Sequence, residues 1–196
     1  MIIGSINSLN YKSPTSWWNR LFKWYNKHQE VDYITQYKYC GVRLFHFRIK
    51  IDKNNHVIVG DSYPLVSLYK VLDYLDGMGD TTLLVTLDES FESYMFSDGH
   101  NVIEKKFKET CDIFETLYKN IKLCGGYREF DKKKLYEFKS EKENGMPNIM
   151  NPNEWSSTYR FIQKWFPFLI TKFNRSYIKR YDNFKGYLML NYVNKR

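Results

Sequence analysis

The stretch YKYCGVRLFHFRIKI, residues Tyr37–Ile51, decides how the fold begins. A short helix expected over Val31–Gly41 ends at its glycine, a residue that commonly follows the last helical turn. From Val42 to Ile51 apolar residues alternate with polar or basic ones, which predicts a β-strand. The turn residues Asp52–Asn55 and the apolar run His56–Gly60 then predict a returning strand, so we expect a β-hairpin.

The rest of the chain alternates helical and strand patterns. The expected helices are Trp17–Lys27, Val66–Met78, Asn101–Ile121 and a segment around Tyr159–Ile170, and the expected strands are Thr81–Ser90 and Gly186–Asn194. No repeat or linker divides the sequence, so residues 1–196 are expected to form a single domain. This alternation predicts an α/β fold with a largely parallel sheet or barrel.

Composition excludes several classes of protein. With 43% hydrophobic and 18% aromatic residues among 196, the chain is expected to be globular rather than disordered. It has no run of about 18 apolar residues, so no transmembrane helix is expected. The N-terminus lacks the pattern of a secretory signal, which favours a cytoplasmic or peripheral membrane location unless a leader has been cut off.

Cysteine and histidine patterns argue against metal and disulfide sites. Cys40, Cys111 and Cys124 are odd in number and lack CxxC spacing, so reduced thiols are expected. The four histidines form no metal-binding pattern. We therefore expect no metal and no cofactor.

The formal net charge of +8 favours anionic partners, such as an anionic phospholipid surface or a phosphorylated small molecule. Much of the excess lies in Lys172–Lys185, which could equally be a solvated basic face. A nucleic-acid partner is not favoured, since charge alone supports it and no RNA-binding or helix-turn-helix motif is present.

Five segments, in order, resemble the X domain of phosphatidylinositol-specific phospholipase C, nearer the small bacterial type than the calcium-dependent eukaryotic type. IIGSINSLNYK resembles the family motif I-x-G-T-H-[DN]-S-x-x-[FY], and GVRLFHFR resembles G-[AV]-R-x-F-D-x-R. The segments are Ile2–Lys12, Tyr37–Lys50, His56–Pro64, Ser67–Ser90 and Gly186–Asn194. Residues 97–180 show no alignment to the family. The resemblance implies a distorted, incomplete TIM-type (β/α) barrel, shortened in its second half, with the site at the carboxyl ends of the strands.

The resemblance also implies a mechanism. In the family, one histidine takes the proton of the inositol 2-hydroxyl, which attacks phosphorus, and a second histidine protonates the leaving oxygen. An arginine stabilises the charge that develops on the phosphoryl oxygens, and carboxylates orient the imidazoles. Each role corresponds to a position of this chain, although most of the residues differ.

The two catalytic histidine positions correspond to Ile6 and Asp61. The aspartate of the strand motif corresponds to His46, and the arginine is retained as Arg48. The aspartate of the last strand corresponds to Asn191. Isoleucine has no titratable proton, and losing one positioned acid or base typically lowers a rate by about 10²–10⁴. The replacements together indicate a catalytically inactive relative, a pseudoenzyme.

The remaining positions concern binding. Asn7 keeps a family-like residue, while a basic substrate-binding residue is replaced by Asp88 or Glu89. We therefore take Asn7, Arg48 and Asp88 as the candidate substrate-binding residues. An alternative interpretation makes Asn7, Asp61 and Asp88 oxygen ligands of a hard cation. Trp17 and Trp18 correspond in position to the aromatic rim helix with which the bacterial enzymes contact membranes, or belong to a helix packed on the barrel wall.

His46 and Arg48 each admit two interpretations. Two residues apart on a strand, they share one face. His46 either replaces a catalytic group or is a buried histidine satisfied by hydrogen bonds, and the second interpretation is favoured. Arg48 either binds a phosphate or pairs with Asp61 across the vacated site.

Three functions follow from these interpretations. The first is a silent phospholipase C-like protein that binds an anionic ligand or membrane surface through its old pocket. The second is a divergent, active phosphoric diester hydrolase that uses His46, Asp61 and Arg48. The third is a structural or interaction protein on the same scaffold.

Overall fold

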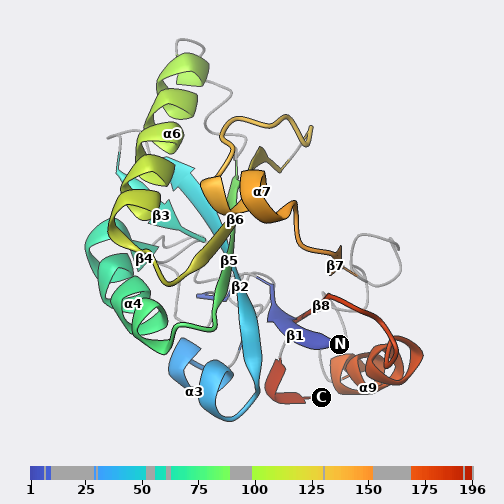
Figure 1. Ribbon diagram of the computed structural model, residues 1–196. Coiled ribbons are helices and arrows are strands. Elements are labelled where there is room, and N and C mark those ends of the chain that lie inside the picture. Colours follow the sequence, from blue (N-terminus) through green and yellow to red (C-terminus); the bar gives the residue numbers. More distant parts are fainter. Residues whose placement is uncertain are drawn as a thin grey trace. The chain divides into compact units, whose positions relative to one another are not determined.

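The computed structural model describes residues 1–6, 8–9, 29, 31–51, 56–60, 63–88, 99–129, 131–151, 169–191 and 193–195 (Figure 1). They group into two compact units, one of Met1–Phe45 with Pro147–Arg196 and the other of His46–Met146. Strand β2 (Val42–Ile51) belongs to the first unit up to Phe45 and to the second from His46 onwards. The expected single domain over residues 1–196 stays a prediction.

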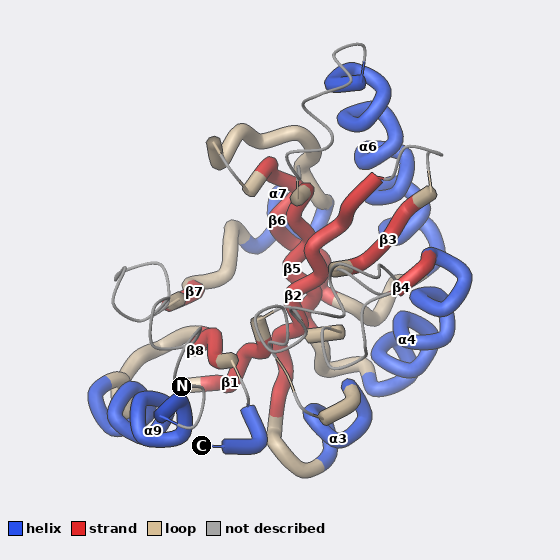
Figure 2. Tube along the Cα trace, turned by 180° about the vertical axis from the view of Figure 1, so that it is seen from behind, coloured by secondary structure: helices blue, strands red, loops and turns tan. Residues whose placement is uncertain are grey.

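The first unit is built on parallel strands. Strand β1 (Ile2–Ser5) pairs in parallel with the beginning of β2 and with β8 (Tyr187–Leu190), and β7 (Ile149–Met150) pairs in parallel with β8. Its helices are α3 (Tyr33–Lys38), α9 (Ile170–Arg180) and the 3₁₀ helix η3 (Val193–Lys195). Figure 2 shows α9 beside β1 and β8.

Several buried polar side chains of the first unit form hydrogen bonds close to strand β1 and helix α3. The Ser5 hydroxyl donates to Gln36 Oε1 over 2.6 Å, and the Gln36 amide donates to the carbonyls of Ser8 and Val31. Asp32 caps α3, since its carboxylate accepts the Thr35 amide hydrogen over 2.8 Å. These bonds fix the chain around the end of β1, because a buried polar group without a partner is costly.

The second unit combines a meander with a parallel pair. Strand β3 (Val57–Val59) pairs antiparallel with β2 and with β4 (Tyr63–Pro64), while β5 (Thr82–Leu87) pairs in parallel with β6 (Lys122–Arg128) and also pairs with β2. Its helices are α4 (Leu65–Met78), α6 (Gly99–Leu117) and α7 (Lys139–Asn144). Both views show α4 and α6 on the same side of β5 (Figures 1 and 2).

Apolar faces at helical spacing explain the packing of the second unit. Helix α4 buries Leu68, Leu72 and Leu75, and α6 buries Phe107 and Phe114. All six side chains of β5 are buried, as expected for a strand covered on both faces. Each fully buried leucine or phenylalanine contributes about 1.5–3 kcal/mol.

Strand β6 contains two glycines that its geometry requires. Gly125 and Gly126 have φ of 101° and 67°, and the β5–β6 register shifts between Val85 and Thr86. The Gly126 carbonyl accepts hydrogen bonds from the amides of Leu135 and Tyr136, at 2.8 and 2.9 Å. A side chain at Gly126 would collide with the Tyr136 carbonyl, so only glycine fits.

Most of the expected elements are confirmed, with shifted ends. The strand Val42–Ile51 and its hairpin with β3 are confirmed, and so is the α/β class. The helix predicted over Val31–Gly41 spans Tyr33–Lys38. The strand predicted to reach Ser90 ends at Leu87. The strand predicted over Gly186–Asn194 spans Tyr187–Leu190.

Three stretches need separate mention. The helix predicted to reach Ile121 ends at Leu117, because strand β6, which the sequence did not reveal, follows at once. The basic segment after residue 170 forms helix α9, which was also not expected. The helix predicted over Trp17–Lys27 and residues 159–168 of the other predicted helix lie outside the described residues.

Candidate functional site

A charged cluster lies at the ends of three strands of the second unit. His46, Arg48 and Lys50 share one face of β2, since side chains two apart on a strand point the same way. Asp88 directly follows β5, and Glu129 directly follows β6. Backbone hydrogen bonds hold both acids in place: the Asp88 amide donates to the Ile49 carbonyl, and the Glu129 amide donates to the Leu87 carbonyl.

Arg48 is the centre of this cluster. Its Nε atom lies 2.6 Å from Glu129 Oε2, and a terminal nitrogen lies 3.0 Å from Asp88 Oδ2. Lys50 Nζ lies 3.3 Å from the same Asp88 oxygen. Two neighbouring nitrogens of the guanidinium, Nε and Nη2, therefore contact carboxylates from two neighbouring strand ends.

Glu129 and its neighbour Arg128 form ion pairs with different partners. Arg128 forms an ion pair with Glu104 of α6 and a second with Asp131, at 3.0 Å. Glu129, the first residue after the strand, instead contacts Arg48 of β2. Hydrogen bonds from the Lys133 amide and from Arg128 lower the pKa of Asp131, which keeps this outer network charged.

Among the described residues, the charges of the cluster balance. Two cations, Arg48 and Lys50, face two carboxylates, Asp88 and Glu129. The side chains are 26%, 26%, 13% and 33% exposed in that order, so solvent screens these pairs only partly. Such a cluster offers little net attraction to a phosphate.

His46 is a buried side chain, 7% exposed. Its Nε2 atom lies 2.9 Å from the hydroxyl oxygen of Thr86 on β5. This geometry matches the favoured interpretation of a buried histidine satisfied by a hydrogen bond. The hydrogen bond of His46 therefore joins β2 to β5, two residues before Arg48 along β2.

Two family positions lie together in the first unit. Ile6, at the end of β1, donates its amide hydrogen to the Leu190 carbonyl over 3.1 Å, so it lies beside the end of β8, where Asn191 follows. The Gln29 amide donates to the carbonyls of both Ile6 and Leu190, at 3.0 and 3.1 Å. Ile6 and Asn191 are 7% and 2% exposed. A buried isoleucine therefore stands where the resemblance places a histidine, next to an uncharged amide where it places an aspartate.

Several predicted site residues cannot be placed. Asn7, Asp61, Trp17 and Trp18 lie outside the described residues, so their roles stay predictions. Arg48 pairs with Asp88 and Glu129, and the alternative of a pair with Asp61 stays a prediction. Within the described ranges, no group of three His, Cys, Asp or Glu side chains could hold a metal ion. None of the described helices is long and apolar enough to cross a membrane.

Two members of the cluster were not predicted from the sequence. Lys50 could have been found, since it continues the face of His46 and Arg48 at the same two-residue spacing. Glu129 follows strand β6, which was not predicted because its two adjacent glycines interrupt the strand pattern. It also lies 81 residues from Arg48, so sequence spacing gives no sign of their contact.

Parallel strands joined by helices define an α/β protein. No protein-family model matches the sequence, and no curated protein matches it. Solved structures do match. Phosphatidylinositol-specific phospholipase C from Listeria monocytogenes matches with a TM-score of 0.57 and 11% identity, over 100% of this chain and 92% of that chain.

Two structures of the Staphylococcus aureus phosphatidylinositol-specific phospholipase C also match. One, from work on the modulation of that enzyme's membrane binding, has a TM-score of 0.55 and 16% identity; the other, of a mutant, has 0.51 and 15%. Each covers 97% of this chain and 85% of that chain. The chain therefore has a fold similar to that of bacterial phosphatidylinositol-specific phospholipase C, a distorted and incomplete TIM-type barrel. The expected fold class is confirmed.

Proposed function

We propose that this chain is a catalytically silent phospholipase C-like protein that binds an anionic phospholipid surface. The observation that carries the proposal is the double ion pairing of Arg48 with Asp88 and Glu129. In the family that the chain resembles, the corresponding arginine stabilises charge on the phosphoryl oxygens. Here two carboxylates occupy Nε and Nη2, the pair of donors that a bidentate phosphate would use.

The replaced base and the replaced supporting carboxylate support the same proposal. The side chain of Ile6 cannot accept a proton. Ile6 is buried, and its backbone amide donates a hydrogen bond to the Leu190 carbonyl at the end of β8. Asn191 carries no charge that could steady an imidazolium. Proton transfer at these positions has no group to perform it.

The competing hypothesis of an active diester hydrolase is less well supported. It needs Arg48 available to substrate and His46 available for proton transfer. Arg48 instead contacts two acids, and the Nε2 atom of His46 faces Thr86. Substrate binding would have to displace those contacts and bring a phosphate close to Asp88 and Glu129, which repel it.

Binding of an anion is better supported outside this cluster than within it. The cations Arg48 and Lys50 are balanced by two acids, whereas the whole chain carries a net charge of +8. Surface cations therefore supply the attraction to anionic lipid, and a peripheral membrane location follows from the proposal. A phosphorylated small molecule in the old pocket is disfavoured by the same charge balance.

Two measurements on the purified chain test this function. The first is release of inositol phosphate from phosphatidylinositol vesicles, and the second is co-sedimentation with vesicles of phosphatidylcholine mixed with phosphatidylserine. The proposal expects no release and salt-sensitive binding. Release that is lost in His46→Ala would support the hydrolase instead, and absence of binding to every anionic vesicle would remove the membrane part.

A further inference from the structure

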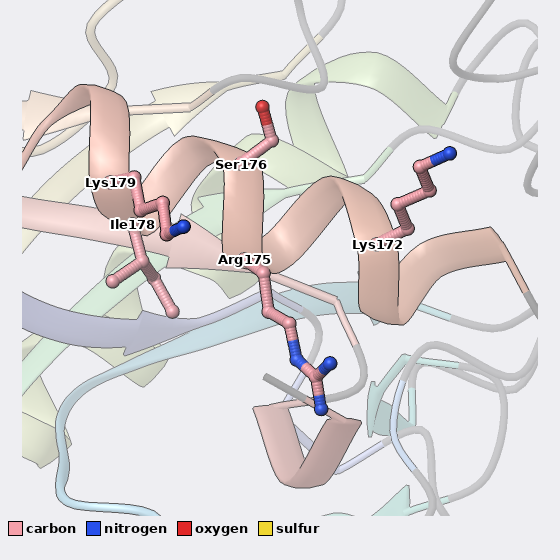
Figure 3. A pocket seen from close by; sticks show the side chains of 5 residues that line it. All are labelled: Lys172, Arg175, Ser176, Ile178 and Lys179. Atoms are coloured by element: carbon pink, nitrogen blue, oxygen red, sulfur yellow. The ribbon is translucent and has the colours of Figure 1, made fainter.

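Helix α9 presents a row of cations along one face. Lys172, Arg175 and Lys179 follow one another at spacings of three and four residues, which places them on the same side of a helix. All three are exposed, and so is Ser176 between them. Together with Ile178 they line a pocket on the helix surface (Figure 3). We call Lys172, Arg175, Ser176 and Lys179 the basic face of α9.

The opposite side of α9 is fixed to its own unit. Asn174 is fully buried, and its side-chain amide donates to the Asn191 carbonyl over 2.9 Å. Phe173 and Tyr177 are half-buried on the same side. Burial raises the pKa of Tyr177, in keeping with that packing. The basic face is therefore held outward by packing on the other side of the helix.

The charge of this face is not balanced within its helix. The helical sequence ITKFNRSYIKR contains no acidic residue. Within the described part of the chain, Lys172, Arg175 and Lys179 form no ion pair. By contrast, Arg48 and Arg128 of the other unit each contact two carboxylates.

The shape and chemistry of the face match a layer of phosphate headgroups. Seven residues of helix span about 10 Å, so the row of cations can contact more than one headgroup at once. Figure 3 shows Arg175 and Ser176 between Lys172 at one end and Lys179 at the other. A guanidinium, two ammonium groups and a hydroxyl all donate hydrogen bonds to phosphate oxygens.

The residues of the pocket favour lipid over nucleic acid. They include no aromatic ring on which a base could stack and no side-chain amide that could read a base edge. The aliphatic Ile178 instead suits the boundary between headgroups and acyl chains.

We propose that the basic face of α9 docks this protein onto an anionic phospholipid surface through several headgroup phosphates. The proposal rests on the membrane binding proposed above and adds the surface responsible for it. Each lysine or arginine held near such a surface strengthens binding about fivefold, so three together account for a factor on the order of 100.

The test compares two triple variants of the full chain with wild type. One is Lys172→Gln, Arg175→Gln and Lys179→Gln. The control is Lys105→Gln, Lys108→Gln and Lys122→Gln, which removes the same charge from exposed positions of the second unit. Binding to vesicles of phosphatidylcholine with phosphatidylserine, and to pure phosphatidylcholine, is measured by co-sedimentation at low and high salt. Circular dichroism confirms that each variant folds.

We expect the α9 variant to lose most of its affinity for the mixed vesicles, at least tenfold, while the control loses only a few-fold. Neither should bind pure phosphatidylcholine. Wild-type binding with equal losses in both triple variants would overturn the α9 assignment but leave the membrane proposal standing. Absence of wild-type binding would overturn both. Binding of a duplex DNA that the α9 variant alone loses, with no vesicle binding, would assign the face to nucleic acid instead.

Discussion

The Nε atom of Arg48 lies 2.6 Å from the Oε2 atom of Glu129, although 81 residues separate the two along the chain. The contact joins β2 to the end of β6 within the second unit. It uses guanidinium hydrogens that would otherwise be available to a phosphate, since carboxylate and phosphate compete for the same planar donors.

Arg48→Ala should destabilise the fold, because it leaves Glu129 without this partner and removes one of the two cations beside Asp88. The pair is half-buried, so we expect a loss of about 1–3 kcal/mol in the free energy of unfolding. Urea denaturation measures it. The control is Lys106→Ala, whose exposed pair with Glu109 at 3.5 Å should cost about 0.5 kcal/mol or less. Equal losses in the two variants would contradict a structural role for Arg48.

Thr86→Val should destabilise the chain by about 0.5–1.5 kcal/mol, because it removes the partner of His46 Nε2 at nearly constant volume. The same substitution in a His46→Phe background should cost markedly less, since the hydrogen bond is already gone. Chemical denaturation of the four proteins of this cycle measures the coupling. Additive effects would mean that the two side chains do not act together.

Gly126→Ala should cost about 2–4 kcal/mol. Its φ of 67° disfavours any side chain, and the new methyl group would meet the Tyr136 carbonyl. The matched control is Gly77→Ala in α4, where nothing lies within 4 Å and alanine should be neutral or stabilise by up to about 1 kcal/mol. Thermal and urea unfolding compare them. A Gly126→Ala variant as stable as wild type would contradict the positive φ of Gly126 and its close approach to the Tyr136 carbonyl.

The contrast between β2 and β6 shows how much could be predicted. Strand β2 was predicted correctly, because its alternation of side chains over ten residues is a local pattern. Strand β6 was missed, because Gly125 and Gly126 break that pattern and its pairing with β5 is a tertiary contact. Helix α9 was not predicted, because its many cations and its asparagine are typical of a solvated surface segment.

The same limits apply to the site. His46, Arg48 and Asp88 were found through the resemblance, and the structure shows Arg48 and Asp88 in contact on adjacent strands, while their role in binding stays a prediction. Glu129 depends on the register of β5 and β6 and could not be found from spacing. Because strand β6 was not predicted, Glu129, which follows its end, was not predicted as a site residue either.

The buried thiols should make stability fall in alkaline solution. Desolvation raises the pKa of Cys111 and of Cys124 well above the ordinary value near 9. The folded state therefore keeps these protons more tightly than the unfolded state. Their contribution to stability is complete below pH 9 or so and declines as pH rises above it. Urea denaturation between neutral pH and pH 10 measures this decline.

A second readout isolates the thiols. In the native state at pH 8 both should react slowly with a thiol reagent, because only the thiolate attacks and both side chains are buried. Reaction should become rapid in urea. Fast reaction of either thiol in the folded protein would contradict its burial.

Release of water-soluble inositol phosphate from phosphatidylinositol tests the central claim most directly. It is measured with a high ratio of protein to lipid and long incubation, for wild type, for Ile6→His, and for the triple variant Ile6→His, Asp61→His, Asn191→Asp. The account predicts no release by wild type and none by Ile6→His, because Asp61 and Asn191 still lack the family's chemistry. Release by wild type that disappears in Arg48→Ala, or release gained by Ile6→His alone, would contradict a silent phospholipase C-like protein.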